Sequence, residues 1–147
     1  MSNVAAPVAN GTSRTNAISP ALKTFLALDF GLKRTGVAVG NRVLRSAQPQ
    51  GSIHAEGDAR FVKIAALLAE WQPDALVIGV PFHPDGAEHE NTLRARRFGR
   101  QLAGRFNLPV FEVDERYTTT EALSMGAKDA DAAAACIILE QFLRSLD

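Results

Sequence analysis

Apolar runs near the start of the chain predict a meander of three strands. Residues 23–30 and 35–40 form two strand-like runs, and Gly31 lies in the short turn between them. A weaker third strand is expected over residues 42–48, with Pro49 ending it. The first two runs therefore predict a β-hairpin, and the third extends it into an antiparallel meander.

Helical and strand-like patterns alternate through the rest of the chain. Asp58 is a plausible N-cap for a helix through Trp71, where the apolar spacing is helical, and Pro73 stops that helix. Residues 75–79 form a continuously apolar run, which is typical of a strand covered on both faces. A turn-rich loop over 80–86 is followed by a helix over 90–106 and a strand over 108–113. A short helix is then expected, capped by Thr118 or Thr119 and ending near Leu123. Asp129 or Asp131 opens the final helix.

This order of elements predicts an α/β fold, since a meander followed by alternating strands and helices builds a mixed sheet with helices on its faces. With 147 residues, of which 46% are hydrophobic, the chain suits one domain. Residues 1–21 lack periodicity and an apolar signal core, so we expect a disordered extension followed by a domain over 22–147. No apolar run is long enough to cross a bilayer, which favours a cytoplasmic protein without a membrane partner.

Charge and cysteine content narrow the chemistry only slightly. Lys plus Arg and Asp plus Glu both number 16, so the net charge does not point to nucleic acid. A cluster of arginines between 94 and 105 has a simple interpretation as a solvated helix face. The single cysteine, Cys136, lies in an apolar run and is expected to be buried and inert.

Acidic residues at the ends of predicted elements suggest a metal site. Asp29 ends the first strand, Asp114 and Glu115 end the last strand, and Asp131 begins the final helix. Sites in open α/β sheets gather at the carboxyl ends of strands, so these acids can converge if the last strand lies beside the first. Carboxylate oxygens are the ligands that Mg²⁺ prefers, and two such ions can promote phosphodiester hydrolysis.

Taken alone, each acid has an ordinary structural interpretation as a helix cap or an ion-pair partner. Three acids at the ends of these elements favour the metal site instead. Strand alternation allows only one of Asp114 and Glu115 to face the site, and we prefer Glu115, although periodicity alone does not decide. Asp129 competes with Asp131 for the third position.

Four segments in order resemble the bacterial YqgF family, also described as Holliday junction resolvases and as pre-16S rRNA nucleases. They are DFGLKRTGVA (29–38), VIGVPF (77–82) with DG (85–86), VDERYTT (113–119), and DAAAA (131–135) with IL (138–139). The resemblance covers nearly everything after the N-terminal extension. It implies an RNase H-like fold, a mixed five-stranded sheet flanked by helices.

The resemblance also implies a function and its residues. Family members are metal-dependent nucleases that mature the 5′ end of small-subunit ribosomal RNA, so RNA is expected as substrate ahead of DNA, with ribosomal precursor particles as partners. Asp29, Glu115 and Asp131 resemble the triad that binds Mg²⁺ or Mn²⁺. Lys33, Arg34 and Arg116 resemble phosphate-facing groups, because a guanidinium can hold a phosphate with two hydrogen bonds.

One departure from the family leaves alternatives open. Residues 121–130 are shorter and less basic than is usual in the family, and only Lys128 is cationic there. The loss of positive charge lowers the expected affinity for nucleic acid. It therefore leaves open the alternative that the protein is a non-catalytic ribosome- or transcription-associated factor. A junction-cutting DNA endonuclease is the other alternative. It requires a homodimer, whereas a monomer suffices for end trimming.

Overall fold

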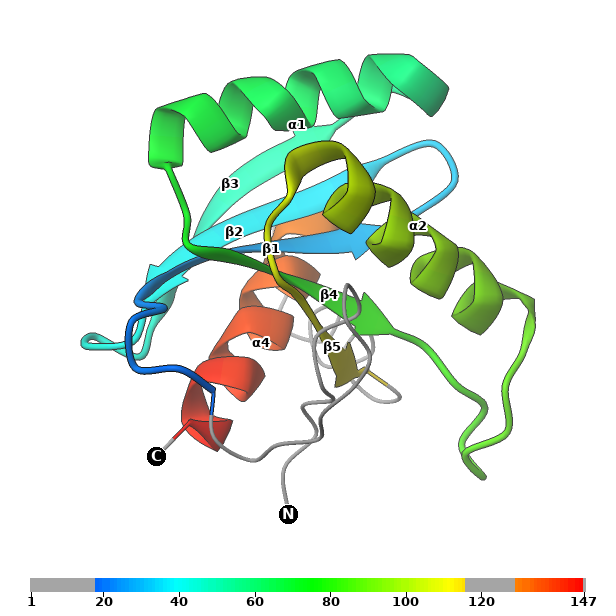
Figure 1. Cartoon of the computed structure of the whole chain (residues 1–147). Coiled ribbons are helices and arrows are strands. Elements are labelled where there is room, and N and C mark those ends of the chain that lie inside the picture. Colours follow the sequence, from blue (N-terminus) through cyan, green and yellow to red (C-terminus); the bar gives the residue numbers. More distant parts are fainter. Residues whose placement is uncertain (1–17, 116–128, 147) are drawn as a thin grey trace.

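A computed structural model describes residues 18–115 and 129–146 as a five-stranded sheet with helices on both faces (Figure 1). The spatial order is β3-β2-β1-β4-β5. The strands are β1 (Thr24–Phe30), β2 (Thr35–Asn41), β3 (Ala47–Ile53), β4 (Ala75–Val80) and β5 (Val110–Asp114). The described helices are α1 (Gly57–Trp71), α2 (Glu90–Phe106) and α4 (Ala130–Ser145).

The sheet is mixed, which confirms the predicted α/β arrangement of a mixed five-stranded sheet flanked by helices. β1, β2 and β3 pair antiparallel as a meander, whereas β1, β4 and β5 pair parallel. The last strand does not lie beside the first, because β4 lies between them. Since all three parallel strands end at the same edge, residues that follow β1 and β5 can still meet across the end of β4.

The third strand lies later in the chain than predicted. It covers Ala47–Ile53 in place of 42–48, and the residues before it form the turn of the β2–β3 hairpin. Asn41 Oδ1 accepts a hydrogen bond from the backbone of Leu44, and Arg45 takes the left-handed conformation at φ 56°. Pro49 lies within the strand and does not end it. An edge strand tolerates proline because one side of its backbone needs no partner.

The second and last helices begin as predicted, whereas the first begins two residues earlier than expected. Glu56 is the N-cap of α1, and Asp58 lies in the first turn, where its charge suits the positive end of the helix dipole. Of the two aspartates proposed to open the final helix, Asp129 is the cap, since its side chain accepts a hydrogen bond from Ala132 N. The short helix expected after Thr118 or Thr119 lies outside the described residues.

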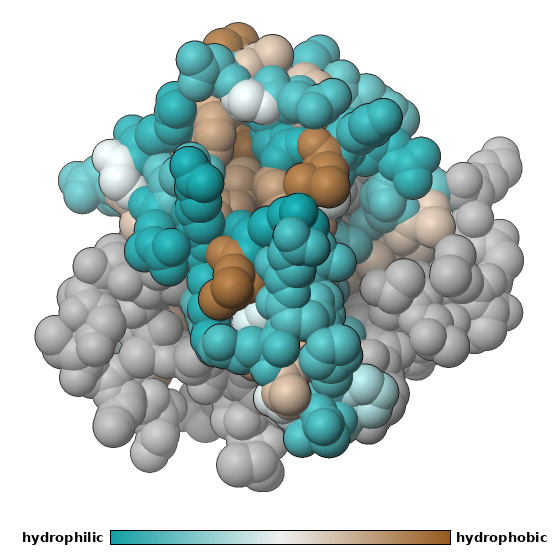
Figure 2. Space-filling model, turned by 90° about the vertical axis from the view of Figure 1, so that its right-hand side faces the viewer, coloured by the Kyte–Doolittle hydropathy of each residue, from teal (hydrophilic) through white to brown (hydrophobic). Residues whose placement is uncertain are grey.

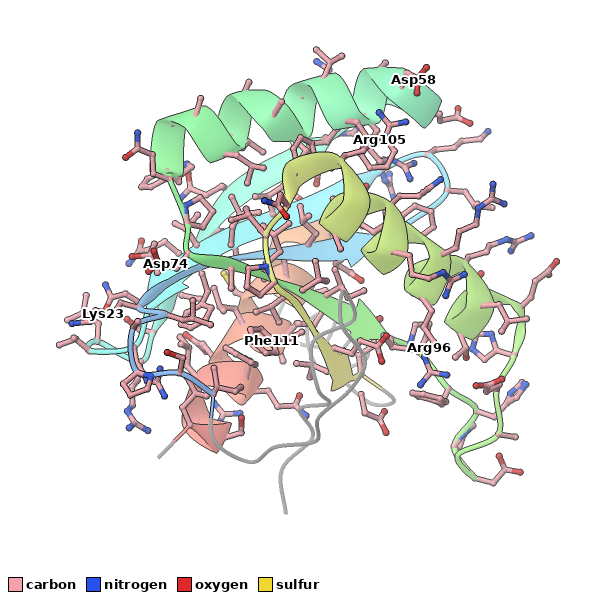
Figure 3. The ribbon with its side chains drawn as sticks, in the orientation of Figure 1. Lys23, Asp58, Asp74, Arg96, Arg105 and Phe111 are labelled. Atoms are coloured by element: carbon pink, nitrogen blue, oxygen red, sulfur yellow. The ribbon has the colours of Figure 1, made fainter. Side chains whose placement is uncertain are left out.

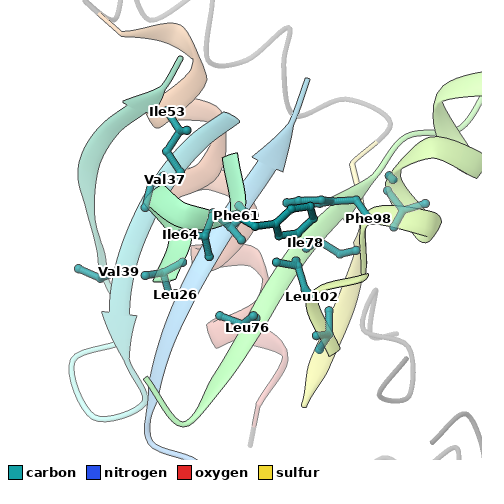
Figure 4. Close-up of a cluster of buried hydrophobic side chains, with 14 residues drawn as sticks. Leu26, Val37, Val39, Ile53, Phe61, Ile64, Leu76, Ile78, Phe98 and Leu102 are labelled. Atoms are coloured by element: carbon teal, nitrogen blue, oxygen red, sulfur yellow. The ribbon is translucent and has the colours of Figure 1, made fainter. Parts of the chain in front are cut away.

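Two hydrophobic cores form on the two faces of the sheet. On one face, α1 and α2 pack against alternate strand residues such as Leu26, Leu76 and Ile78 (Figure 4). On the other face, α4 covers the intervening residues, and Phe142 contacts the rings of Phe25 and Phe111 at centroid distances of 5.0 and 5.4 Å. This alternation decides which residues at the strand ends face α4.

The first described residues are joined to the domain. Ile18 packs against the core under α4, and the Arg42 guanidinium donates hydrogen bonds to the carbonyls of Ile18, Ser19 and Leu22. Of the extension predicted to be disordered over residues 1–21, residues 1–17 lie outside the described part of the chain. Among the described helices, none is long and apolar enough to span a membrane.

Candidate active site

A row of alternating glycines and acids crosses the sheet at the end of its parallel strands. In spatial order it runs Gly36 on β2, Asp29 on β1, Gly79 on β4 and Glu115 directly after β5. All four lie on the α4 side, because they continue the alternate positions of Ala38, Ala27, Val77 and Val113 that pack in the core under α4. The period of the strands therefore gathers two carboxylates on one face, with a glycine beside each.

Asp29, which is half-buried, and Glu115, which is buried, form a carboxyl pair joined by a hydrogen bond. Burial, together with the charge of Asp131, raises the pKa of Asp29 from 3.8 to about 6, although the hydrogen bond from Glu115 opposes the rise. Burial, followed by the charge and hydrogen bond of Asp29 and the charge of Asp114, raises the pKa of Glu115 from 4.5 to about 9. The pair therefore retains a proton at neutral pH, with Glu115 as the donor.

Strand β4 positions Glu115. The backbone N–H of Glu115 donates to Val80 O at 3.2 Å, which extends the β4–β5 ladder by one residue. At Gly79, an added Cβ would lie 2.7 Å from Glu115 Oε1 and 2.5 Å from Ile138 Cδ1, so a side chain there would displace the carboxyl group from its present position. The Oε1 atom is buried and has no hydrogen-bond partner within the described residues. Such an oxygen is available to a cation.

Gly36 brings the first turn of α4 against the sheet. Gly36 is the cross-strand partner of Asp29, and an added Cβ there would lie 1.9 Å from the carbonyl oxygen of Asp131. The absence of a side chain at Gly36 thus sets how closely the start of α4 approaches Asp29. Asp131 is near enough for its charge to raise the pKa of Asp29.

The Asp131 carboxylate is held by two polar groups beside the acid pair. Arg34 Nε lies 3.0 Å from Asp131 Oδ2, and Ser52 Oγ lies 3.4 Å from the same oxygen. Ser52 also contacts Asp129 at 2.8 and 3.0 Å. Burial by itself raises the pKa of Asp129. Hydrogen bonds from Ala132 N and Ser52 lower it, and the pKa lies below its usual value. Asp129 therefore acts as a cap, and Asp131 is the aspartate near Asp29.

The donor set suits a hard divalent cation, although the three acids are not gathered around one point. In the described part of the chain, no three acidic, histidine or cysteine side chains are close enough together to hold a metal ion as they stand. Asp29 and Glu115 supply carboxylate oxygens, including the unpartnered Oε1, and such oxygens are what Mg²⁺ and Mn²⁺ prefer. Asp131, 31% exposed and paired with Arg34, is the adjacent third acid.

Basic residues lie on the open side of the acids. Lys33 and Arg34 line a pocket of ≈ 610 Å³ together with His54 and Asp131. A second pocket of ≈ 390 Å³ contains Asp29 and Glu115 and continues along the β1–β2 turn. Arg116, the third expected phosphate-facing residue, lies outside the described residues. His83, in the loop after β4, lines neither pocket, and its ring centroid lies 4.7 Å from that of His89.

The site also depends on residues that the sequence did not single out. Arg60 of α1 is 5% exposed and donates to Leu32 O at 2.6 Å and to Ala55 O at 3.1 Å, which fixes the β1–β2 turn. Asn91, in the first turn of α2, lines the acid pocket. The strand-interior glycines were the available signal for Gly36 and Gly79, since such glycines mark close backbone approach. No sequence pattern singles out Arg60.

Comparison with known proteins gives a consistent family match. The model of a family described as RuvX, Holliday junction resolvase, matches residues 23–145. A protein of Albidiferax ferrireducens with the name "Putative pre-16S rRNA nuclease" is 78% identical over 95% of this chain and 91% of its own length. Proteins of the same name from a Polaromonas species and from Paraburkholderia phymatum are 68% and 52% identical, covering 88% and 84% of this chain and 94% and 86% of their own lengths.

Solved structures give weaker matches. Thermus thermophilus RuvC in complex with a Holliday junction substrate has a TM-score of 0.49 and 16% identity, covering 83% of this chain and 95% of that chain. The Pelota protein of Thermoplasma acidophilum has a TM-score of 0.45 and 10% identity, covering 92% of this chain and 40% of that chain.

Proposed function

Because the chain belongs to the family described as RuvX, Holliday junction resolvase, we propose that it is a nuclease that hydrolyses phosphodiester bonds. The observation that carries the proposal is the pair formed by half-buried Asp29 and buried Glu115 at the open end of the sheet. A folded protein has little reason to bury two carboxyl groups against each other unless a cation or a reaction uses them. The pocket of ≈ 610 Å³ beside the pair is lined by Lys33 and Arg34, which suits an anionic substrate.

We propose Asp29, Glu115 and Asp131 as the residues that hold Mg²⁺ or Mn²⁺. When bound, such an ion activates water and stabilises the leaving oxygen of a phosphodiester. Glu115 contributes the oxygen that has no partner and releases its proton as the cation binds. Arg34 and Ser52 hold the Asp131 carboxylate beside the pair, so that a change of partner brings the third acid into the site.

Lys33, Arg34 and Arg116 are proposed to bind the phosphates of the substrate. Arg34 has a double role in this arrangement, because the guanidinium that pairs with Asp131 is 59% exposed. An exposed ion pair contributes little stability, so a substrate phosphate can take over the guanidinium and leave Asp131 for the cation.

The substrate that we propose is the 5′ end of a ribosomal RNA precursor, and the names of the relatives support it. Precursor particles of the ribosome are then the natural partners, and the cytoplasm is the compartment in which they would be met. A second candidate is a DNA four-way junction, which the description of the family favours. Symmetric cutting of a junction would require two copies of the chain related by a two-fold axis.

The deciding experiment is cleavage of a labelled small-subunit rRNA precursor, with a four-way DNA junction in parallel. Each is incubated with Mg²⁺, Mn²⁺ or EDTA, using the wild-type chain and Asp29→Asn. We expect metal-dependent cutting of the RNA that Asp29→Asn abolishes without lowering the melting temperature, because asparagine keeps the shape and removes a charge facing Glu115.

The other outcomes separate the alternatives. Cutting of the junction alone would favour the DNA endonuclease. An intact, metal-binding protein that cuts neither substrate would favour a non-catalytic factor with the same fold. A large fall in melting temperature for Asp29→Asn would mean that Asp29 is structural.

A further inference from the structure

A groove lined by arginines lies between α1 and α2 and begins where the acid pocket ends. Its volume is ≈ 320 Å³, and its lining includes four arginines and a single carboxylate, Asp58. The four arginines are Arg60, Arg94, Arg97 and Arg105. Figure 3 shows Arg105 beside the N-terminal end of α1, close to Asp58, to which it is bonded at 3.0 Å. The groove is therefore a concentration of positive charge in a chain of zero net charge.

Residues of the β1–β2 turn connect the groove to the acids. Phe30 and Leu32 line both the groove and the pocket that contains Asp29 and Glu115. Leu32 also lines the pocket that contains Lys33 and Arg34, and it is 57% exposed. The groove and the two pockets thus meet at the β1–β2 turn. The side of the molecule toward which the turn and the start of α2 project is mostly hydrophilic, with isolated hydrophobic residues (Figure 2).

One face of α2 carries the polar lining from the acid pocket into the groove. Asn91 lines the acid pocket, and Arg94, Gln101 and Arg105 follow at helical spacing along the groove. Arg97 also lines the groove. The predicted interpretation of the arginine cluster as a plain solvated face therefore accounts for only part of it. Arg96 does not line the groove. It forms ion pairs with Glu88 and Glu112 on another face of α2, which is a structural role.

The charges of the three groove arginines that belong to α2, Arg94, Arg97 and Arg105, are available to a ligand. Arg97 has no ion-pair partner among the described residues, and the pairs of Arg94 with Glu90 and of Arg105 with Asp58 lie at the surface, where they are weak. The floor is aromatic: the Arg60 guanidinium lies 4.5 Å from the Phe30 ring centroid, and that of Arg105 lies 4.1 Å from the Phe61 ring centroid. These cation–π contacts hold two of the four guanidinium groups in place without neutralising their charge.

We propose that the groove between α1 and α2 binds the phosphodiester backbone of the nucleic-acid strand that flanks the phosphate held at the acids. The proposal rests on the proposed nuclease function and deepens it, because it assigns the direction in which the strand leaves the site. A polyanion matches the excess of guanidinium groups, and the shared lining by Phe30 and Leu32 gives it a continuous path.

Binding of RNA to a cleavage-deficient chain tests the groove. Fluorescence anisotropy with a labelled single-stranded RNA is measured at several salt concentrations for the full-length Asp29→Asn protein, and then with Arg97→Gln or Arg100→Gln added. Arg100 is the matched control, because it is an exposed arginine of the same helix that does not line the groove. Arg97→Gln is expected to weaken binding about fivefold at ~0.1 M salt and to lower the salt slope by ~0.7. Arg100→Gln is expected to change neither.

Three results would overturn the proposal. They are no binding of RNA by the Asp29→Asn parent, an unchanged affinity and slope for Arg97→Gln, and an equal loss for Arg97→Gln and Arg100→Gln. The last would mean that overall charge, and not the groove, binds the strand. Failure of the nuclease function is seen separately, as a wild-type chain that cuts neither substrate with any metal ion.

Discussion

At the scale of single residues, the acid pair is the unusual feature of this protein. Burial raises the pKa of both Asp29 and Glu115. The charge of Asp29 raises the pKa of Glu115 further, whereas the hydrogen bond from Glu115 lowers the pKa of Asp29. In the folded chain without a cation, Glu115 therefore binds a proton that it would release in the unfolded chain at the same pH. The cost of this burial depends on pH.

Without metal ions, the wild-type chain is expected to lose stability as pH rises. The folded-state pKa of Glu115, about 9, lies above its ordinary value of 4.5, so the folded state holds more protons between these limits. The stabilisation from this group is then greatest below pH 4.5, and it falls by up to ~1.4 kcal/mol per pH unit between pH 4.5 and 9. Glu115→Gln cannot lose a proton, so its stability at pH 8 should exceed that of the wild-type chain.

Urea unfolding in EDTA at pH 5, 6, 7 and 8 measures this effect as the difference between wild type and Glu115→Gln. Titrating groups that do not contact Glu115 are common to both chains and cancel, so the difference reports Glu115 together with its partner Asp29. A difference that does not grow with pH would mean that Glu115 is ionised in the folded chain and that the acid pair does not share a proton.

At the scale of elements, two glycines decide whether the acids meet. Gly79 leaves space for the Glu115 carboxyl group next to Ile138, and Gly36 lets the first turn of α4 touch β2. Without these close approaches the same strands and helix could form, but Glu115 and Asp131 would be displaced from Asp29. The glycines therefore position the site without contacting a substrate.

Gly36→Ala is expected to destabilise the protein by about 2–4 kcal/mol and to reduce cleavage, because its Cβ would overlap the backbone of Asp131 and move α4 outward. Gly104→Ala is the matched control, since an added Cβ there meets no atom within 4 Å in the described chain and Gly104 lies within α2. That change should stabilise the helix by ~0.5–1 kcal/mol. Thermal unfolding measures both, and equal effects would contradict the role of Gly36.

At the scale of the whole molecule, the site lies where the sheet meets the helix layer formed by α4. Asp29 and Glu115 belong to the sheet, and Asp131 belongs to the helix, which packs on the sheet through Phe142, Leu139 and Ile138. A cation bound by all three acids would therefore join two layers of the fold. Metal binding should be visible in global stability and not only in activity.

Mg²⁺ or Mn²⁺ is expected to raise the melting temperature of the wild-type chain. A cation at a hundred times its dissociation constant stabilises the folded state by ~2.7 kcal/mol, which corresponds to several degrees for a domain of this size. Asp29→Asn should show little of this shift, because it lacks one of the carboxylates. Differential scanning calorimetry with and without EDTA measures the shift, and equal shifts in both chains would place cation binding elsewhere.

The amino-acid sequence by itself determined much of the architecture and the element ends that carry the acids. The strand-like runs around residues 24–30, 35–41, 75–80 and 110–114 and the helical spacing between them follow from local hydrophobic patterning, which needs no tertiary information. The third strand was predicted too early in the chain, because Pro49 was expected to end it. Proline is tolerated at a sheet edge, and the position of a strand in its sheet is not encoded locally.

The tertiary structure alone decided how the acids are arranged. Alternation in β5 could not tell Asp114 from Glu115 until the packing of Phe111 and Val113 under α4 fixed which face is which. Asp129 and Asp131 were separated only by the contacts of Ser52 and Arg34, which lie far from them in the sequence. The burial that raises the pKa of Asp29 and Glu115 likewise exists only once helix and sheet close over them, since desolvation depends on long-range packing.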